Sequence, residues 1–533
     1  MAKKLTAIIL TVSLLLTAFA IPSSAATEVT SSTERGFYRF VDGLLDGLVS
    51  GIAALIFEPK DWVDKDDYVS ENFYEGYDAK DFLDEPAEDA AWSLGYSNAS
   101  LLTGKELEEE HYVGGSLSVT KKLADEVRDD QKVRTIAISD GRGISIFAVL
   151  DSFGLANNEV RVIREKFQAY ADANNLEITS INISCLHQHS CVDTFGLNGD
   201  IISALFTSSI KNLFGIEVPS GKNKNYMENL YKVTVQSMVD AVKDMKEGDL
   251  YYGSVDMSEY IRDKRDPQVF DGELNRLRFV PHAEGERETW LLNLPVHCVG
   301  NGAAGTLLTG DYPYFIEKYL NEEENANFIQ ILGAELAITS LYPEVLDTDP
   351  ELVKEYDEGY ARMAAYGELL GKLAASIAND EVVSPILNIS FTEVFVPIEN
   401  SIFKLAAKGG LLTNTVIRDG LAYETVTEVG YAEFGTNLAI AIIPGELAPE
   451  IAYGGAVSAE DSWDGTTWNY SAFADITDRR VIVFGITNDQ IGYMMTSNDW
   501  RSYLTENEEI VSTGPDAGAI IAEAYLSLYD EIN

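Results

Sequence analysis

Basic residues are scarce in this sequence of 533 residues. Lysine and arginine together number 39, against 86 aspartates and glutamates, and the formal net charge is −47. Proteins that bind nucleic acids or anionic membranes need clustered lysine and arginine, because these side chains replace the counterions of phosphate groups. The composition therefore excludes DNA, RNA and anionic membrane surfaces as partners.

Cysteine and histidine are also rare. Three cysteines cannot form a disulfide framework for a chain of this length. Hydrophobic residues make up 46% of the sequence, and their packing must hold the fold together. There are only five histidines, yet two of them lie between Cys185 and Cys191, and a third directly precedes Cys298. These positions are the first candidates for chemistry.

Several common catalytic motifs are absent. The sequence has no G-x-S-x-G nucleophile elbow, no H-E-x-x-H zinc motif and no Walker A loop. Its acidic stretches lack the full ligand spacing of an EF-hand calcium loop. Chemistry must therefore be sought at isolated polar residues rather than in one contiguous motif.

Long apolar runs are confined to the N-terminus. Lys3 and Lys4 precede the run of residues 5–21, and small residues follow it. This pattern is typical of a cleaved secretory signal peptide over residues 1–26. The alternative is a retained membrane anchor, but the run is at the short end of the roughly 20 residues that a span requires. We expect an exported, extracellular protein with no membrane span after signal removal.

Residues 27–90 are predicted to form an amphipathic helix followed by an acidic connector. Apolar residues at three- and four-residue spacing place the helix at 37–57, and residues 58–90 are rich in Asp, Glu, Tyr and Pro. The helix could lie on a membrane surface, cover a substrate, or dock on the body of the protein. Its polar face has few basic residues, which favours docking.

The remaining chain, residues 91–533, alternates strand-like and helix-like segments and is predicted to form one main domain. A strand, a helix and a second strand at 144–154, 157–175 and 176–190 predict a βαβ unit, and the pattern recurs later in the chain. The expected fold class is α/β, with a large mixed β-sheet as the core and helices on its faces. Further strands are predicted at 132–139, 289–300, 437–446 and 479–489, and further helices at 229–246 and 357–380.

His187 and His189 are predicted near the end of a strand. Alternate residues of a strand share a face, so the two imidazoles would project the same way from positions about 6.6 Å apart. Both could then reach one metal ion or one substrate atom. Cys185 and Cys191 would be about 20 Å apart on an extended strand, too far for one zinc site, and are expected to be buried hydrophobic residues.

Three more polar residues lie where predicted strands meet loops. His297 stands before a glycine-rich loop, which is where open α/β sheets place ligands. Glu446 closes the apolar run LAIAIIPGE, and a carboxylate at the mouth of a buried strand needs a partner or a metal. Tyr493 follows the strand-like run VIVFGITN, where a tyrosine most often serves packing.

Taken in order, these segments resemble the N-terminal catalytic domain of the neutral/alkaline non-lysosomal ceramidase family. HQHS (187–190) is similar to the family's T-H-T-H-S motif, and residues 294–320 to its histidine loop. Residues 437–451 and 487–500 resemble the segments that carry its glutamate and its closing tyrosine. The resemblance covers about residues 91–533.

The resemblance implies a zinc-dependent amidohydrolase. By position, the family's Zn²⁺ ligands correspond to His187, His297, Glu446 and Tyr493. His189 corresponds to the histidine beside metal and substrate, which would donate to the oxyanion or pass a proton to the leaving amine. Imidazole and carboxylate ligands suit Zn²⁺ and leave a position for water. The expected substrate is a small molecule or lipid with an N-acyl bond, and the oligomeric state is left open.

The sequence departs from the family in three places. Cys191-Val192-Asp193 replaces a G-P-G stretch, and Ala337 occupies the position of a serine linked to activity. The sequence also ends soon after the tyrosine segment, at Asn533, so we expect no C-terminal immunoglobulin-like domain. These departures motivate the alternative of a non-catalytic extracellular binding protein with a ceramidase-like fold.

Overall fold

The computed structural model describes residues 32–115, 121–216, 221–300, 305–340, 346, 348–504 and 508–533. The predicted signal peptide lies outside the described residues, as do residues 301–304 of the glycine-rich loop.

The larger of two main sheets has nine strands. These are β2 (Trp92–Ser100), β4 (Lys132–Ser139), β5 (Ile144–Leu150), β6 (Ile178–Cys185), β7 (Lys246–Asp256), β9 (Glu273–Pro281), β10 (Glu288–Leu294), β12 (Ala326–Leu332) and β14 (Glu381–Val383). The order is β12-β10-β9-β7-β2-β4-β5-β6, with β14 paired to β7. The pairs β5–β6 and β10–β12 are parallel, and the other neighbours are antiparallel, so the sheet is mixed.

The second main sheet has six strands. These are β1 (Val63–Asp64), β15 (Leu387–Pro397), β16 (Val416–Asp419), β17 (Ala422–Phe434), β18 (Leu438–Ile442) and β20 (Arg480–Phe484). The order is β1-β16-β17-β18-β20, with β15 paired to β17. Short two-stranded pairs join β3 (Glu126–Val127) to β11 (Leu307–Leu308), β8 (Ile261–Asp263) to β13 (Ile338–Ser340), and β19 (Glu446–Leu447) to β21 (Tyr493–Met494).

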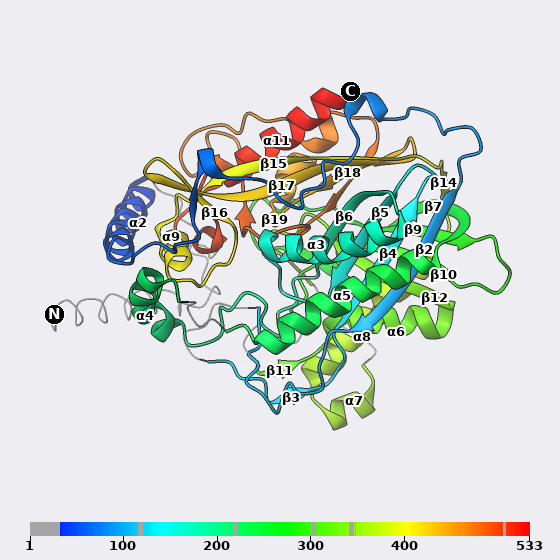
Figure 1. Cartoon of the computed structure of the whole chain (residues 1–533), viewed down its shortest axis with the longest axis horizontal. Helices are drawn as coiled ribbons and strands as arrows, with labels where there is room; N and C mark the ends of the chain where they lie inside the picture. The colour runs from blue at the N-terminus through cyan, green and yellow to red at the C-terminus, as the bar shows by residue number, and fades with distance from the viewer. Residues whose placement is uncertain are drawn as a thin grey trace.

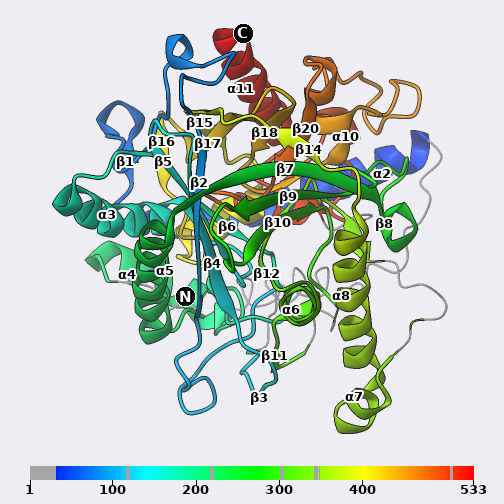
Figure 2. The ribbon, with the colours of Figure 1, turned by 90° about the vertical axis from the view of Figure 1, so that its right-hand side faces the viewer.

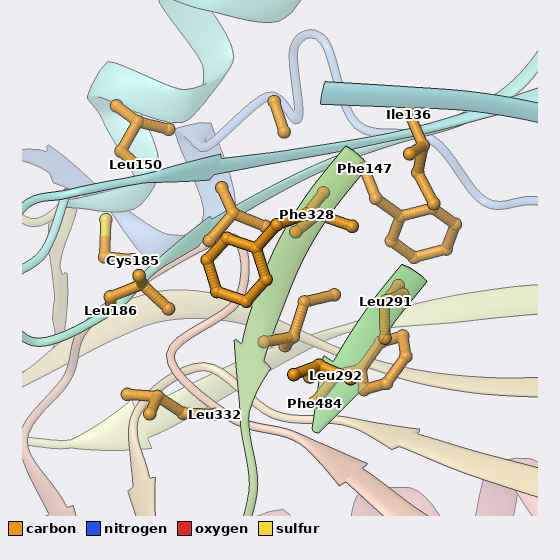
Figure 3. Close-up of a cluster of buried hydrophobic side chains, with 14 of the residues drawn as sticks. Ile136, Phe147, Leu150, Cys185, Leu186, Leu291, Leu292, Phe328, Leu332 and Phe484 are labelled. Atoms are coloured by element: carbon orange, nitrogen blue, oxygen red, sulfur yellow. The ribbon is translucent and has the colours of Figure 1, made fainter. Parts of the chain in front are cut away.

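The two main sheets pack face to face, and aromatic residues fill the space between them. The ring of Phe147 on β5 lies 5.9 Å from that of Phe484 on β20 and 6.2 Å from that of Phe434 on β17. Figure 3 shows Phe147 and Phe484 together with Phe328 of β12 and leucines of β10. Burial of these apolar side chains is the main source of stability.

Helices cover the outer faces of both sheets (Figures 1 and 2). Helix α5 packs on β2 and β4 of the larger sheet, and α11 packs on β15 and β17 of the smaller one. The helices are α2 (Ser32–Ala53), α3 (Asn157–Asn174), α4 (Ile201–Phe214), α5 (Lys224–Asp244), α6 (Asp311–Tyr319), α7 (Pro350–Glu355), α8 (Glu358–Ser376), α9 (Ser401–Lys408), α10 (Pro449–Tyr453) and α11 (Ala517–Ile532). The layers confirm the predicted α/β fold with a mixed sheet flanked by helices.

The predicted βαβ unit is present as β5, α3 and β6. Its strands pair in parallel, and α3 ends where Asn175 adopts a left-handed conformation with φ 53°. Asparagine tolerates this conformation and commonly caps a helix C-terminus. Several predicted strands end too late: the strand predicted over 176–190 ends at Cys185, and those predicted over 144–154, 289–300, 437–446 and 479–489 end at Leu150, Leu294, Ile442 and Phe484, because the chain turns into loops there. The pair His187 and His189 therefore lies beyond the strand.

The predicted N-terminal helix is α2, and it is docked on the body. Val49, Ala53 and Ile56 pack with Leu405 of α9. The acidic segment that follows is bonded to β15, since the amide of Tyr77 donates to the carbonyl of Ile389 at 2.7 Å. In the described part of the chain, no helix combines the length and the apolar character that crossing a bilayer requires.

Candidate metal centre

The polar residues singled out in the sequence meet beside the carboxyl ends of strands from both main sheets. His187 and His189 follow β6, His297 follows β10, Glu446 follows β18, and Tyr493 follows β20. Backbone hydrogen bonds join these strand ends: Gly333 to Leu294 at 3.0 Å, Gly485 to Leu332 at 2.9 Å, and Cys185 to Ile486 at 3.1 Å. Carboxyl ends of strands are the usual ligand-binding edge of α/β sheets.

The two neighbouring histidines converge through a turn rather than through strand alternation. His187 has φ 49°, in the left-handed region that non-glycine residues rarely occupy. The imidazole centroids of His187 and His189 lie 4.8 Å apart, and that of His297 lies 5.0 Å from His187. The two imidazoles lie close together because of this turn, and not because of the strand alternation that the sequence suggested, since β6 ends at Cys185.

The carboxylate of Glu446 is the centre of the cluster. Its Oε1 lies 3.4 Å from Nε2 of His187, and its Oε2 lies 3.0 Å from Nε2 of His297. The side-chain amide of Gln490 donates to Oε1 at 3.0 Å. Because β19 pairs in parallel with β21, Tyr493 stands directly opposite Glu446 in the register.

Backbone carbonyls fix the orientation of two imidazoles. Nδ1 of His187 lies 3.0 Å from the carbonyl oxygen of Phe153, and Nδ1 of His297 lies 2.9 Å from that of Ile338. A carbonyl oxygen only accepts, so each Nδ1 carries a proton, and each Nε2 faces Glu446 and can bind a metal once it carries no proton itself. Metal-binding histidines typically have this arrangement, with the distal nitrogen bonded to a carbonyl or carboxylate.

His189 is the least satisfied member of the cluster. Both of its ring nitrogens are buried, and neither has a hydrogen-bond partner among the described residues. Its backbone amide donates to the carbonyl of Cys298 at 3.0 Å, and a Cβ added at Gly115 would lie 2.1 Å from its Cα. The ring is therefore held in place by the backbone while its nitrogens remain available to a ligand.

Glu335 belongs to the site but was not predicted. It follows β12, is fully buried, and has Oε2 3.2 Å from Nδ1 of His297. Neither carboxylate oxygen has a hydrogen-bond partner among the described residues. The sequence did contain a signal, because an acidic residue closing the apolar run ANFIQILGAE repeats the pattern that pointed to Glu446.

Burial and neighbouring charges set the protonation states. Burial lowers the pKa of His187 to about 4 and the pKa of His189 well below its usual range. Burial also raises the pKa of Glu335 to about 8. For Glu446 burial acts to raise the pKa, but the facing His187 and His297 outweigh it and hold the pKa below its usual value. At neutral pH the site therefore offers two neutral imidazoles and one carboxylate.

His297 and Tyr493 respond to the surrounding acidic groups. Burial alone would lower the pKa of His297, but the charges of Glu335 and Glu446 raise it above its usual value. The pKa of Tyr493 is raised well above its usual range by burial, and the charge of Glu446 raises it further. Without a cation the tyrosine is a neutral phenol. Metal binding displaces protons from such ligands, so affinity should depend on pH.

The geometry and the donor types fit Zn²⁺. Donor atoms about 2.0–2.2 Å from a tetrahedral zinc ion lie about 3.4 Å from one another. The distances from Glu446 to His187 and His297 are 3.4 and 3.0 Å. Donor atoms of His187, His189 and His297 lie within 4.8 Å of one another, as do those of His187, Glu335 and Glu446. Imidazole and carboxylate donors suit zinc.

The three cysteines are buried as free thiols. Cys185, Cys191 and Cys298 are free and buried, and Sγ of Cys191 donates to the carbonyl of Gln188 at 3.1 Å. Burial raises the pKa of each thiol, so they remain protonated. They are the buried hydrophobic residues that the sequence predicted.

Comparison with known proteins relates the fold to one group of enzymes. No protein-family model matches the sequence, and no curated protein matches it. The neutral ceramidase from Pseudomonas aeruginosa superposes with a TM-score of 0.58 and 17% sequence identity, over 84% of this chain and 75% of that chain. A ceramidase complexed with C2 superposes with a TM-score of 0.56 and 16% identity, over 83% and 76%. The chain therefore has a neutral ceramidase-like fold, as its sequence motifs predicted.

Proposed function

We propose that this protein is an exported zinc-dependent amidohydrolase that cleaves an N-acyl bond, with lipid amides as the principal substrate class. The observation that carries the proposal is the convergence of Nε2 of His187 and Nε2 of His297 on the carboxylate of Glu446, at 3.4 and 3.0 Å. The ceramidase-like fold supports an amide substrate. Export rests on the sequence of residues 1–26 alone.

His187, His297, Glu446 and Tyr493 would hold the ion, as the family resemblance implies. Bound Zn²⁺ supplies a Lewis acid that polarises a carbonyl and lowers the pKa of water to about 7. The chain supplies the remaining chemistry. His189 is neutral and its ring nitrogens are buried, so one of them can donate to the developing oxyanion or pass a proton to the leaving amine.

The substrate side differs from that of ceramidases proper. Ala337 is 1% exposed, and has φ 64° in the turn between Glu335 and Ile338. Glu335 and Ile338 both contact His297, so the turn that contains Ala337 lines the site. Since this position lacks a hydroxyl, we propose N-acyl amides as a class rather than ceramide itself. The same observation motivates the second candidate, a binding protein that retains the metal but lacks turnover.

Metal removal tests the proposal. Purified protein should contain about one zinc per chain, hydrolyse fluorogenic N-acyl amides, lose activity on dialysis against a chelator, and recover it when Zn²⁺ is added back. Zinc content is measured by elemental analysis and rates by fluorescence. Stoichiometric zinc without turnover on short- and long-chain substrates would favour the binding protein. Absence of bound metal, also after incubation with Zn²⁺, would contradict both.

Glu335→Gln is expected to weaken zinc binding by about 10- to 100-fold, because carboxylates that orient a metal-binding histidine contribute about this much to affinity. The change replaces the ionisable carboxyl group 3.2 Å from Nδ1 of His297 by an amide and preserves side-chain volume. Competition with a chromogenic chelator measures the affinity. Glu450→Gln is the control, since Glu450 is another acidic group with a burial-raised pKa, at about 7. Equal affinities in the two variants would show that Glu335 has no role at the metal.

A further inference from the structure

One end of the molecule exposes a long apolar surface. On α2 the side chains of Phe37, Phe40, Leu44 and Leu48 are 52% to 65% exposed, and on α4 Ile210 and Phe214 are 65% and 67% exposed. We call these six residues the apolar strip. Scattered exposed apolar residues are common on soluble proteins, but contiguous ones usually mark an interaction site.

The strip belongs to a well-anchored part of the fold. The side-chain amide of Asn212 on α4 donates to the carbonyls of Phe57, just after α2, at 2.7 Å and of Lys408 on α9 at 2.8 Å. Figure 1 shows α2, α9 and α4 together at the left end of the molecule. Leu205 of α4 packs against the cluster that Val49 and Ala53 of α2 form with Leu405 of α9, so the three helices are joined into one part of the fold.

Helix α2 turns two acidic side chains toward the body, beside the apolar contacts of Val49 and Ala53, and turns aromatic side chains outward. Asp42 accepts a hydrogen bond from Ser502 at 2.9 Å, and Asp46 accepts one from Ser401 at 2.6 Å. Phe37 and Phe40 on the same helix point to solvent. The outer face of a surface helix in a soluble protein normally carries charged residues rather than aromatic ones. The outer face of α2 is thus suited to an apolar environment.

Charges around the strip indicate what can cover it. Within residues 34–60 and 200–216, the exposed charged residues are Glu34, Arg39, Lys60 and Asp200, which sum to zero, and the loop that Arg35 and Arg39 contact adds the exposed acidic residues Glu460, Asp461 and Asp464. The whole chain carries −47, so a second copy and an anionic membrane would both be repelled. An electrically neutral, zwitterionic lipid layer is not repelled. Phenylalanine and leucine side chains enter the headgroup boundary of such a layer by about 5–10 Å.

Apolar side chains also connect the metal centre with α4. Phe153 contacts His189 at a ring-centroid distance of 5.2 Å and contacts Phe195 at 6.1 Å. Five residues beyond Phe195 along the chain, Asp200 caps the start of α4 by accepting from the amide of Ser203. A short stretch of chain thus leads from buried Phe195, which contacts Phe153 beside the metal centre, to the start of α4.

We infer that the apolar strip docks this protein on a neutral, zwitterionic lipid surface, from which it takes its amphiphilic substrate. The second half of this inference rests on the proposed function, whereas docking itself does not. Lipid binding and catalysis can therefore be tested separately.

Tryptophan probes test the docking. Phe40→Trp and Phe214→Trp, each in the full chain, are mixed with vesicles of brominated phosphatidylcholine, and emission is compared with that of the parent protein. We expect a blue shift and at least twofold quenching at both probes. Leu421→Trp is the control, since Leu421 is fully exposed in the turn between β16 and β17. Replacing part of the phosphatidylcholine by an anionic lipid should reduce the effect.

Three outcomes would overturn the inference. Probes that do not respond to vesicles would exclude docking. A blue shift that appears without vesicles and grows with protein concentration would show that a second copy of the protein covers the apolar strip. A blue shift without vesicles that does not depend on protein concentration would show that another segment of this chain covers it. None of these measurements needs zinc or turnover. If the hydrolase proposal also holds, Leu44→Asp combined with Phe214→Asp should slow hydrolysis of vesicle-borne substrate at least tenfold, with rates on a soluble short-chain amide unchanged.

Discussion

Glu446→Gln is expected to abolish stoichiometric zinc binding and to lower the rate of N-acyl hydrolysis by a factor on the order of 10³. The glutamine keeps the size of the side chain, but it removes the charge that faces His187 at 3.4 Å and His297 at 3.0 Å. Metal assistance is worth several kcal/mol of transition-state stabilisation, and about 4 kcal/mol corresponds to a thousandfold change in rate. Elemental analysis and initial rates measure the two effects.

Glu433→Gln is the matched control for this change. Glu433 is a buried glutamate on β17 that pairs with Arg479 at 2.8 Å, away from the metal centre. Its replacement should leave zinc stoichiometry and catalytic rate unaffected, whatever it does to stability. If Glu446→Gln retained one zinc per chain and the parental rate, the assignment of Glu446 as a ligand would be wrong.

Arg134→Met is expected to reduce the free energy of unfolding by about 3–5 kcal/mol, because it leaves two buried carboxylates without their cation. Arg134 on β4 is 1% exposed and bonds to Asp151 at 2.7 Å and to Glu317 at 2.6 Å. Asp151 is fully buried. The remaining nearby cation, Lys132, reaches only Glu317, at 3.1 Å. Equilibrium unfolding in urea, followed by circular dichroism, measures the change.

Two further variants show whether the loss comes from the buried charges. Lys354→Met removes a pair with Glu351 in which both side chains are well exposed, and should alter stability by no more than about 0.5 kcal/mol. Arg134→Met combined with Asp151→Asn and Glu317→Gln removes all three charges and should recover much of the loss. A loss below about 1 kcal/mol in Arg134→Met alone would contradict the proposed role of the cluster.

Periodicity and turn residues were sufficient for the fold class. The βαβ unit from β5 to β6 is visible in the sequence as two apolar runs around an amphipathic helix that ends at an asparagine pair. These signals are local, and local preference agrees with the tertiary structure here. The end of β6 was misjudged for the opposite reason. Leu186 continues the apolar pattern and is fully buried, so the sequence contains no sign that the chain turns at His187.

The candidate site was only partly accessible to sequence reasoning. His187, His297, Glu446 and Tyr493 could be named from the order of motifs, and the structure brings them to one place. Glu335 was missed although its pattern resembles that of Glu446, because a single acidic residue after an apolar run has no partner in the sequence. Its significance depends on the 3.2 Å approach to His297, which a one-dimensional pattern does not contain.

Helix α2 was also predicted only in part from the sequence. Its amphipathic pattern and its docking on the body could be inferred from the sequence, since a helix with few basic residues is poorly suited to an anionic membrane surface. The sequence did not show that Asp42 and Asp46 face the body while Phe37 and Phe40 face outward, because the helix has apolar residues on more than one side.

The sequence by itself determined the acidic character, the α/β class and the chemical types available for a metal site, because composition, periodicity and residue type are properties of the chain. The tertiary structure alone decided which donor atoms meet. Their convergence depends on hydrogen bonds between strand ends that are far apart in sequence, and on the carbonyls that orient His187 and His297. These contacts form only when the two sheets pack against each other, so no local pattern contains them.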